Sequence, residues 1–94
     1  MKKLNEAAEE YKKILEIDPN FFETRHSLGN VLATQAANLI NKGKVKEGWK
    51  KLKEAKSELE SALKLNPDSA GTLELIEYIE NTQKTLQSRY PDLK

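Results

Sequence analysis

Apolar residues recur every three or four positions through four stretches of the chain, and proline, glycine and polar residues separate these stretches. This spacing gathers the apolar side chains on one face of a helix and leaves lysine and glutamate on the other. No window of useful length alternates apolar and polar residues with a period of two, so no sheet is expected. The pattern predicts an all-α chain of four helices, at about residues 3–17, 21–41, 45–65 and 70–89.

Proline or glycine residues between the predicted helices explain where the first three helices end. The first and third helices end at Asp18-Pro19 and Asn66-Pro67, because the residue before a proline is pushed out of the α region. Gly43 suits a left-handed stop after the second helix. The connections are therefore short, and short connections force consecutive helices to pack antiparallel.

Helix starts are also marked. Asn20 is followed three residues later by Glu23, which fits a capping box at the start of the second helix. Asp68 or Ser69 is expected to cap the fourth helix, because a short polar side chain can accept a hydrogen bond from an amide of the first turn.

Two segments of the chain repeat one another. Residues 6–19 superpose without gaps on residues 54–67, and the two copies share their prolines, Pro19 and Pro67. A common amphipathic pattern alone would not explain the shared proline with an acidic or amide residue before it.

At these residues the chain resembles the tetratricopeptide repeat family. The second helix of that family's repeat has small or aromatic residues at set distances before a proline, and its first helix carries a Leu-Gly pair. The matching positions are Ala7, Tyr11, Ile14 and Pro19, then Leu28 and Gly29, then Ala55, Leu59, Ala62 and Pro67. The resemblance implies an array of helix-turn-helix units that binds other proteins without catalysing a reaction.

The two prolines lie 48 residues apart, whereas the family's repeat is about 34 residues long. The excess divides into about seven residues in each of the two middle helices, and about seven residues make close to two helical turns, so the apolar faces stay in register. We therefore expect a tetratricopeptide-like array with an extended central hairpin, each helix being about 10 Å longer.

Composition restricts the chemistry. A chain of 94 residues has room for one domain, residues 1–94. It has no cysteine and one histidine, so no metal site, no cofactor and no enzymatic activity are expected. No apolar run is long enough to cross a membrane and the start does not resemble a signal peptide, so a cytoplasmic location is expected, without membrane insertion.

Charge is uneven along a chain whose formal net charge is only +1. Residues 42–56 contain seven lysines and two glutamates. A basic stretch can indicate nucleic acid, but it contains no arginine and no aromatic ladder to contact bases. We interpret the lysines as the solvated face of a helix and expect no nucleic-acid partner.

By contrast, residues 26–41 contain no Asp, Glu, Lys or Arg. One explanation is that the second helix is central and mostly buried by its neighbours. The other is that its free face lines a concave groove that holds a peptide, and the two can apply to different sides of one helix. The residues expected on that face are Glu23, His26, Ser27, Asn30, Thr34 and Asn38, with Ala37 and Asn41 beside them.

Trp49 lies on the apolar stripe of the third helix. Core packing near the hairpin tip is the expected role, and an exposed Trp49 would instead be a candidate hot spot for a partner.

The sequence thus favours a non-catalytic module that binds a protein or peptide on the concave face of its second helix. The alternative is a fragment or an engineered helical-repeat scaffold whose role is structural or is self-association. The chain begins in mid-repeat and holds fewer than the three repeats usually needed for stability, so a homodimer through the first or fourth helix could cover its apolar edges.

Overall fold

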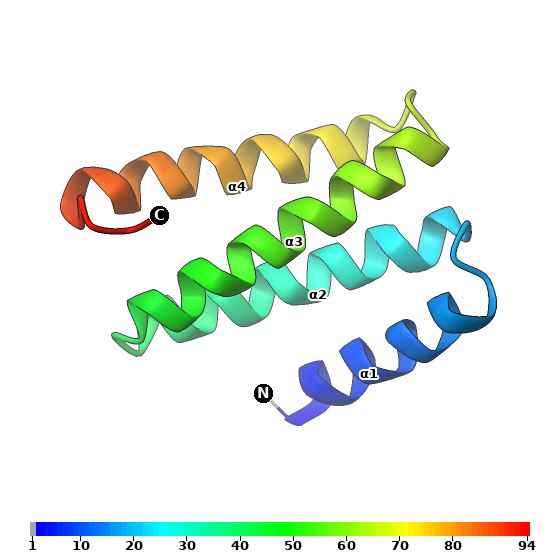
Figure 1. The fold of residues 1–94 in the computed structure, drawn as a ribbon, viewed down its shortest axis with the longest axis horizontal. Helices are drawn as coiled ribbons and strands as arrows, with labels where there is room; N and C mark the ends of the chain where they lie inside the picture. Colours follow the sequence, from blue (N-terminus) through cyan, green and yellow to red (C-terminus); the bar gives the residue numbers. More distant parts are fainter. Residues whose placement is uncertain (1) are drawn as a thin grey trace.

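Four α-helices follow one another along the chain and lie side by side, as the apolar periodicity predicts. In the computed structural model, which describes residues 2–94, they are α1 (Lys2–Ile17), α2 (Phe22–Asn41), α3 (Val45–Leu65) and α4 (Ala70–Arg89). Each helix runs antiparallel to the one before it (Figure 1). The all-α prediction and the four predicted helices are confirmed.

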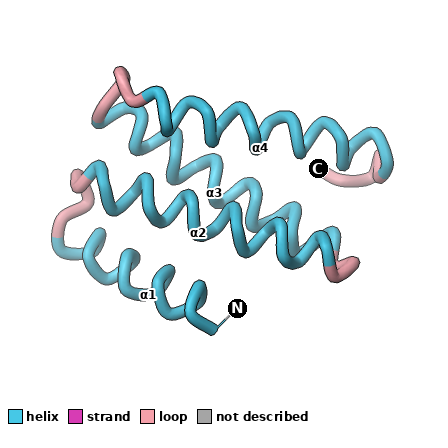
Figure 2. The backbone as a smooth tube through the Cα atoms, turned by 180° about the vertical axis from the view of Figure 1, so that it is seen from behind, coloured by secondary structure: helices cyan, strands magenta, loops and turns pink. Residues whose placement is uncertain are grey.

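Helix α2 is central. It packs against α1, α3 and α4, whereas α1 contacts α2 alone among the described helices. Because α2 and α4 are both antiparallel to α3, they run in the same direction, which the view from behind shows (Figure 2). This arrangement leaves one face of α2 open between α1 and α4.

Small residues at the crossing of α2 and α3 leave no space for a larger side chain. Gly29 of α2 lies against Leu59 of α3, and a Cβ atom built on Gly29 would lie 2.5 Å from the Leu59 Cγ. Gly48 of α3 lies against Ile40 of α2 in the same way, at 2.5 Å from the Ile40 Cγ1. Ala55 is fully buried at the same crossing.

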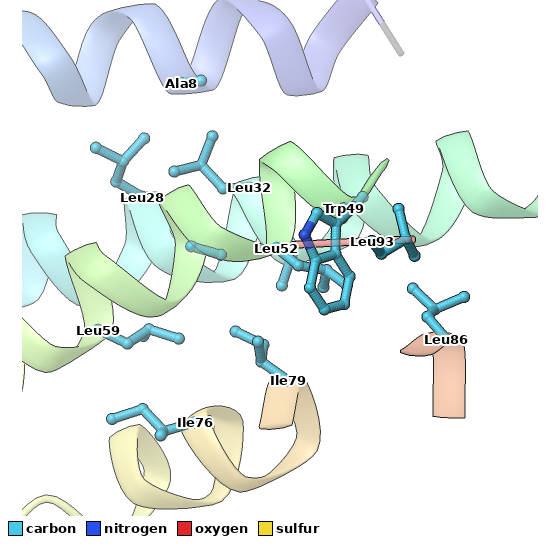
Figure 3. Close-up of a cluster of buried hydrophobic side chains, with 13 residues drawn as sticks. Ala8, Leu28, Leu32, Trp49, Leu52, Leu59, Ile76, Ile79, Leu86 and Leu93 are labelled. Carbon is cyan, nitrogen blue, oxygen red and sulfur yellow. The ribbon is translucent and has the colours of Figure 1, made fainter. Parts of the chain in front are cut away.

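The hydrophobic core continues on both sides of this crossing. Its largest fully buried apolar side chains come from α2, α3 and α4 (Figure 3). They are Leu28, Leu32, Leu52, Leu59 and Ile79. The apolar faces read from the sequence are therefore the faces that pack together.

Two of the predicted helix boundaries have the expected chemistry. Gly43 adopts a φ of 83°, the left-handed conformation that glycine tolerates at a helix stop. Ser69 is the N-cap of α4, and its side-chain oxygen accepts a hydrogen bond from the Thr72 amide at 3.3 Å. Asp68 was the alternative cap, and the structure selects Ser69.

The predicted capping box of Asn20 and Glu23 is wrong. The N-cap of α2 is Phe21, which makes no side-chain capping bond. Asp18 instead organises the turn, because its Oδ1 accepts a hydrogen bond from the Asn20 amide at 3.2 Å and its main-chain oxygen accepts one from the Phe21 amide at 3.4 Å. Asn20 therefore lies inside the turn, one residue too early to cap the helix.

Arg25 ties the start of α2 to two other parts of the chain. Its Nε donates a hydrogen bond to the Pro19 main-chain oxygen at 2.9 Å. Its Nη1 forms an ion pair with Glu58 of α3, also at 2.9 Å. One guanidinium thus holds the α1–α2 turn and the α2–α3 pair in register.

The segment after α4, residues 90–94, turns back over α3, and we call it the strap. Its Leu93 is only 8% exposed and belongs to the core cluster, close to Trp49 and Leu86 (Figure 3). The Leu93 main-chain oxygen accepts a hydrogen bond from Gln87 Nε2 at 3.2 Å, and that of Lys94 accepts one from Lys53 Nζ at 3.1 Å. The sequence pattern gave no indication of this return.

The α2–α3 crossing leads to a stability prediction. Gly29→Ala is expected to lower the free energy of unfolding by about 1–3 kcal/mol, because the added methyl group displaces the buried Leu59. This outweighs the gain of about 1 kcal/mol that alanine gives a helix over glycine. Urea unfolding followed by circular dichroism measures the difference.

Gly71→Ala is the matched control in α4, where the new Cβ would lie 3.9 Å from His26 Cε1, an ordinary contact. This variant is expected to be as stable as the wild type or slightly more so. Equal stability of the Gly29→Ala and Gly71→Ala variants would contradict the role given to Gly29.

Candidate functional site

The predicted face of α2 is open to solvent along most of its length. Glu23, Asn30 and Thr34 are exposed, while His26, Ser27 and Asn38 are half-buried. Ala37 and Asn41 lie on the same face, the first half-buried and the second exposed. The opposite side of α2 carries Leu28 and Leu32 in the core. Packing and an open polar face therefore occupy different sides of one helix.

His26 is committed to a structural network at one end of this face. Its Nδ1 lies 2.8 Å from the Thr72 hydroxyl of α4, which in turn lies 2.8 Å from the Ser69 hydroxyl. Its ring also stacks on Phe22, with the ring centroids 5.9 Å apart. These contacts join α2 to α4 and narrow the space between them at this end.

The middle of the face keeps free hydrogen-bonding groups. The Thr34 hydroxyl donates to the Asn30 main-chain oxygen of its own helix at 3.0 Å. The Asn30 side-chain amide has no hydrogen-bond partner among the described residues, so it can both donate and accept without breaking a bond of the fold.

Beyond His26 the space between α2 and α4 widens into an open cavity of about 650 Å³, which we call the α2/α4 groove. Apolar side chains such as Ile40 and Leu86 line it together with hydroxyl and amide groups. Its two walls are formed by Ile40 and Asn41 on α2, and by Tyr78, Asn81, Thr82, Thr85, Leu86 and Arg89 on α4, and Gly43, Val45 and Tyr90 complete the lining. Of the predicted face, only Asn41 lines this cavity.

The α4 wall was missed by the sequence reasoning, although a signal was present. Tyr78, Thr82, Thr85 and Arg89 follow one another at spacings of four, three and four residues, so they share one face of the predicted fourth helix. Tyr78 is 53% exposed and is the largest side chain of this wall. Arg89 forms no ion pair among the described residues.

Trp49 belongs to the core rather than to the surface. It is 8% exposed, and its indole Nε1 is buried without a hydrogen-bond partner among the described residues. The expectation of core packing near the hairpin tip is confirmed. The exposure that would make Trp49 a hot spot is absent, because Leu93 of the strap packs in the same cluster.

The strap is held by few contacts. Burying one leucine contributes about 1.5–3 kcal/mol. Each of the four hydrogen bonds of the strap, two to side chains and two within the main chain, contributes about 1 kcal/mol. Fixing the backbone of each ordered residue costs about 1–2 kcal/mol. The favourable and unfavourable contributions are of the same size, so the strap is bound only marginally to the four-helix body.

Two of the seven lysines between residues 42 and 56 pair with glutamate. Lys56 lies 3.1 Å from Glu80 of α4, and Lys51 lies 4.0 Å from Glu54 of its own helix. Within residues 2–94, no group of three His, Asp or Glu side chains comes close enough together to hold a metal ion. None of the helices in this range has the length and apolar character needed to cross a membrane.

The geometry defines a class of protein: an array of antiparallel helices, paired by short turns, with helices of the same direction lining one open face. Comparison with protein families agrees with this. The family model described as tetratricopeptide repeat matches residues 1–21 and 36–69. These matches cover more than half of the chain, which therefore belongs to the tetratricopeptide repeat family. Neither a search of curated proteins nor a search of solved structures found a match.

The two matched segments correspond to different parts of the fold. The first contains α1 and the turn that follows it. The second contains the end of α2, the tip of the hairpin and α3. Repeats of this family generally mediate interactions between proteins.

The His26 network supports a prediction. Thr72→Val is expected to lower the free energy of unfolding by about 1–2 kcal/mol, because His26 Nδ1 and the Ser69 hydroxyl both lose a buried partner. Thr82→Val is the matched control, since the Thr82 hydroxyl only donates to the Tyr78 main-chain oxygen of its own helix. Urea unfolding of both variants tests this, and similar losses would contradict a special role for Thr72.

Proposed function

We propose that this chain is a non-catalytic protein-interaction module that binds a peptide or a helix across the open face of α2 and the α2/α4 groove. The observation that carries the proposal is the pairing of a polar face on α2, uncharged from His26 onward, with an accessible, partly apolar wall on α4. A concave surface with apolar contacts and a few convergent hydrogen-bonding groups is typical of a binding site.

Each part of this surface has a role in the proposal. Ile40 and Tyr78 supply apolar contact area, and an exposed tyrosine provides much contact area at a low cost in conformational entropy. The free Asn30 amide and the exposed Asn41 can bond the main chain of a peptide. Neutral side chains do so without demanding a charge on the ligand, which suits recognition of backbone and apolar groups.

The narrow end at His26 and Thr72 gives the site a direction. There α2 and α4 are joined by side-chain hydrogen bonds, whereas at the other end the groove is open beside Asn41 and Arg89. A bound peptide would therefore lie along α2 and α4, with its main contacts over the later turns of both helices.

Substitutions on each wall test the site. Asn30→Arg combined with Thr34→Arg on α2, and Thr82→Arg on α4, are expected to weaken peptide binding by on the order of tenfold, about 1.4 kcal/mol, because bulky charges fill the face. Peptides are first selected on the wild-type chain from a phage-displayed random library. Fluorescence anisotropy of the selected peptides then gives the dissociation constants.

Ser57→Arg, at an exposed position of α3 that lines none of these surfaces, is the control and should bind as the wild type does. Circular dichroism verifies that all variants fold. Equal binding by the wild type and by the variants of both walls would refute the groove proposal.

Self-association is a second candidate, favoured by a different observation. The end of α1 and the turn after it expose large apolar side chains: Ile14 at 39%, Ile17 at 87% and Phe21 at 44%. A second copy of the chain could cover these side chains and remove them from water.

This candidate predicts that the mass in solution, measured by light scattering, rises with concentration toward that of a dimer. Ile17→Lys is expected to return the chain to a monomer, since a lysine at the contact would have to be desolvated. Lys13→Ala, also at an exposed position of α1, is the control. A wild type that stays monomeric at all concentrations excludes self-association.

A further inference from the structure

The strap places one apolar side chain in a preformed site. Leu93 packs in the cluster that contains Trp49 of α3 and Leu86 of α4 (Figure 3). Leu93 is also the one buried residue among residues 90–94. Trp49 and Leu86 belong to α3 and α4, so hydrogen bonds of those helices, and not the strap, hold their backbone. We call this site, formed by Trp49 and Leu86, the leucine socket.

Lysines predominate beside the leucine socket. The charged residues that line a cavity beside it are Lys46, Glu47, Lys50 and Lys53 of α3 together with Asp92 and Lys94 of the strap. Asp92 forms no ion pair among the described residues, so it lies near these lysines without pairing with one. The strap therefore presents an acidic residue followed by a leucine to an apolar site rimmed by lysines. Lys50 forms no ion pair among the described residues, and the Lys53 Nζ contact is to the main-chain oxygen of Lys94.

The strap closes the leucine socket itself, since Trp49, Leu86 and Leu93 are each at most 8% exposed, but it leaves open space beside the socket. A second open cavity, of about 660 Å³, separates residues 89–93 from residues 43–47 at the hairpin tip. The Trp49 Nε1 stays buried without an acceptor among the described residues. The strap also has no helix or strand of its own. Two main-chain hydrogen bonds hold it, from the Tyr90 amide to the Leu86 oxygen at 2.7 Å and from the Leu93 amide to the Tyr90 oxygen at 3.0 Å. Its Leu93 and Lys94 main-chain oxygens are held by flexible side chains, Gln87 and Lys53.

We propose that the leucine socket is a second recognition site, specific for peptide segments in which an acidic residue precedes a leucine, and that the strap is its intramolecular ligand. A partner segment of this chemistry displaces Asp92-Leu93 and places its own leucine against Trp49 and Leu86. Lysines at the rim pair with the partner's acidic residue. The proposal does not rest on the α2/α4 groove: the two sites share Leu86, but Trp49 belongs to the leucine socket alone.

The chain offers its own probe. A synthetic peptide with the sequence of residues 88–94 carries the Asp-Leu pair, and the same peptide with serine in place of leucine is its control. Trp49 is the only tryptophan, so its emission reports directly on the leucine socket. The full-length variant Leu93→Ser releases the strap, and Leu73→Ser, at an exposed position of α4, is the matched control.

In Leu93→Ser the Trp49 emission is expected to shift to longer wavelength while the helical circular dichroism signal is retained. Adding the peptide should reverse the shift, and the serine peptide should not. The peptide is expected to bind Leu93→Ser on the order of tenfold more tightly than the wild type, because the strap no longer competes. Leu73→Ser should behave as the wild type does.

Asp92→Lys provides a second test that removes no buried group, since Asp92 is exposed. Repulsion from the rim lysines is expected to loosen the strap and produce the same shift in Trp49 emission, more strongly at low salt. Lys50→Glu in the Leu93→Ser background should weaken peptide binding. The double variant Asn30→Arg, Thr34→Arg should not change it, which separates this site from the groove.

Several outcomes would overturn the proposal. One is loss of the helical signal in Leu93→Ser together with unchanged Trp49 emission in Asp92→Lys, which would make the strap an integral part of the core. Equal binding of the leucine and serine peptides would show that the socket is not specific for leucine. A wild-type dimer that the peptide dissociates would show that straps are exchanged between two copies, contrary to an intramolecular ligand.

Discussion

The close crossing of α2 and α3 is the constraint on which the rest of the structure depends. Gly29 and Gly48 leave room for Leu59 and Ile40 where any larger residue would collide with them. The two backbones can therefore approach closely, and dispersion contacts add up over the length of both helices. Once α3 is fixed on one side of α2, the sides left for α1, for α4 and for solvent are determined.

The uncharged stretch of residues 26–41 follows from this arrangement. A charged side chain on a face covered by α1, α3 or α4 would have to be buried, which is costly without a partner. Gln35 shows how little polarity is tolerated there: it is buried, its Nε2 donates a hydrogen bond to Asn5, and its Oε1 is left without a partner among the described residues. Only the remaining face can carry polar groups freely, and it carries Asn30 and Thr34. Packing and the open face are thus two consequences of one central position.

The local pattern of apolar residues, prolines and glycines was sufficient to predict the helices. It did not identify the residues that their side chains contact. The positions of α1 to α4 depend on apolar period and on prolines and glycines, which are local properties. The Asn20 capping box failed because the Asp18 side chain accepts the hydrogen bond of the Asn20 amide that Glu23 would have accepted, and which of the two forms depends on the geometry of the turn. Predicting the α4 wall would have required the knowledge that α2 and α4 are parallel neighbours, which no local pattern contains. Leu93 is a single apolar residue after a proline and a charge, so no period identifies it as buried.

The length of the middle hairpin connects the groove and the leucine socket. Helix α1 has 16 residues and α2 has 20, and the contact of Asn5 with Gln35 places the early part of α1 beside the later half of α2. The last turn of α2 and the tip of the hairpin therefore project beyond the part that α1 covers (Figure 1).

Both surfaces lie on this projection. Gly43 and Val45 of the tip line the α2/α4 groove and also the cavity beside the strap. A hairpin without the additional turns would end before Ile40 and Trp49 could contribute to either surface. The additional turns of the two paired helices extend the core while their apolar faces stay aligned. They also form an exposed end of the hairpin, against which α4 and the strap pack. The elongation thus accounts for the α2/α4 groove and the leucine socket through one change in helix length.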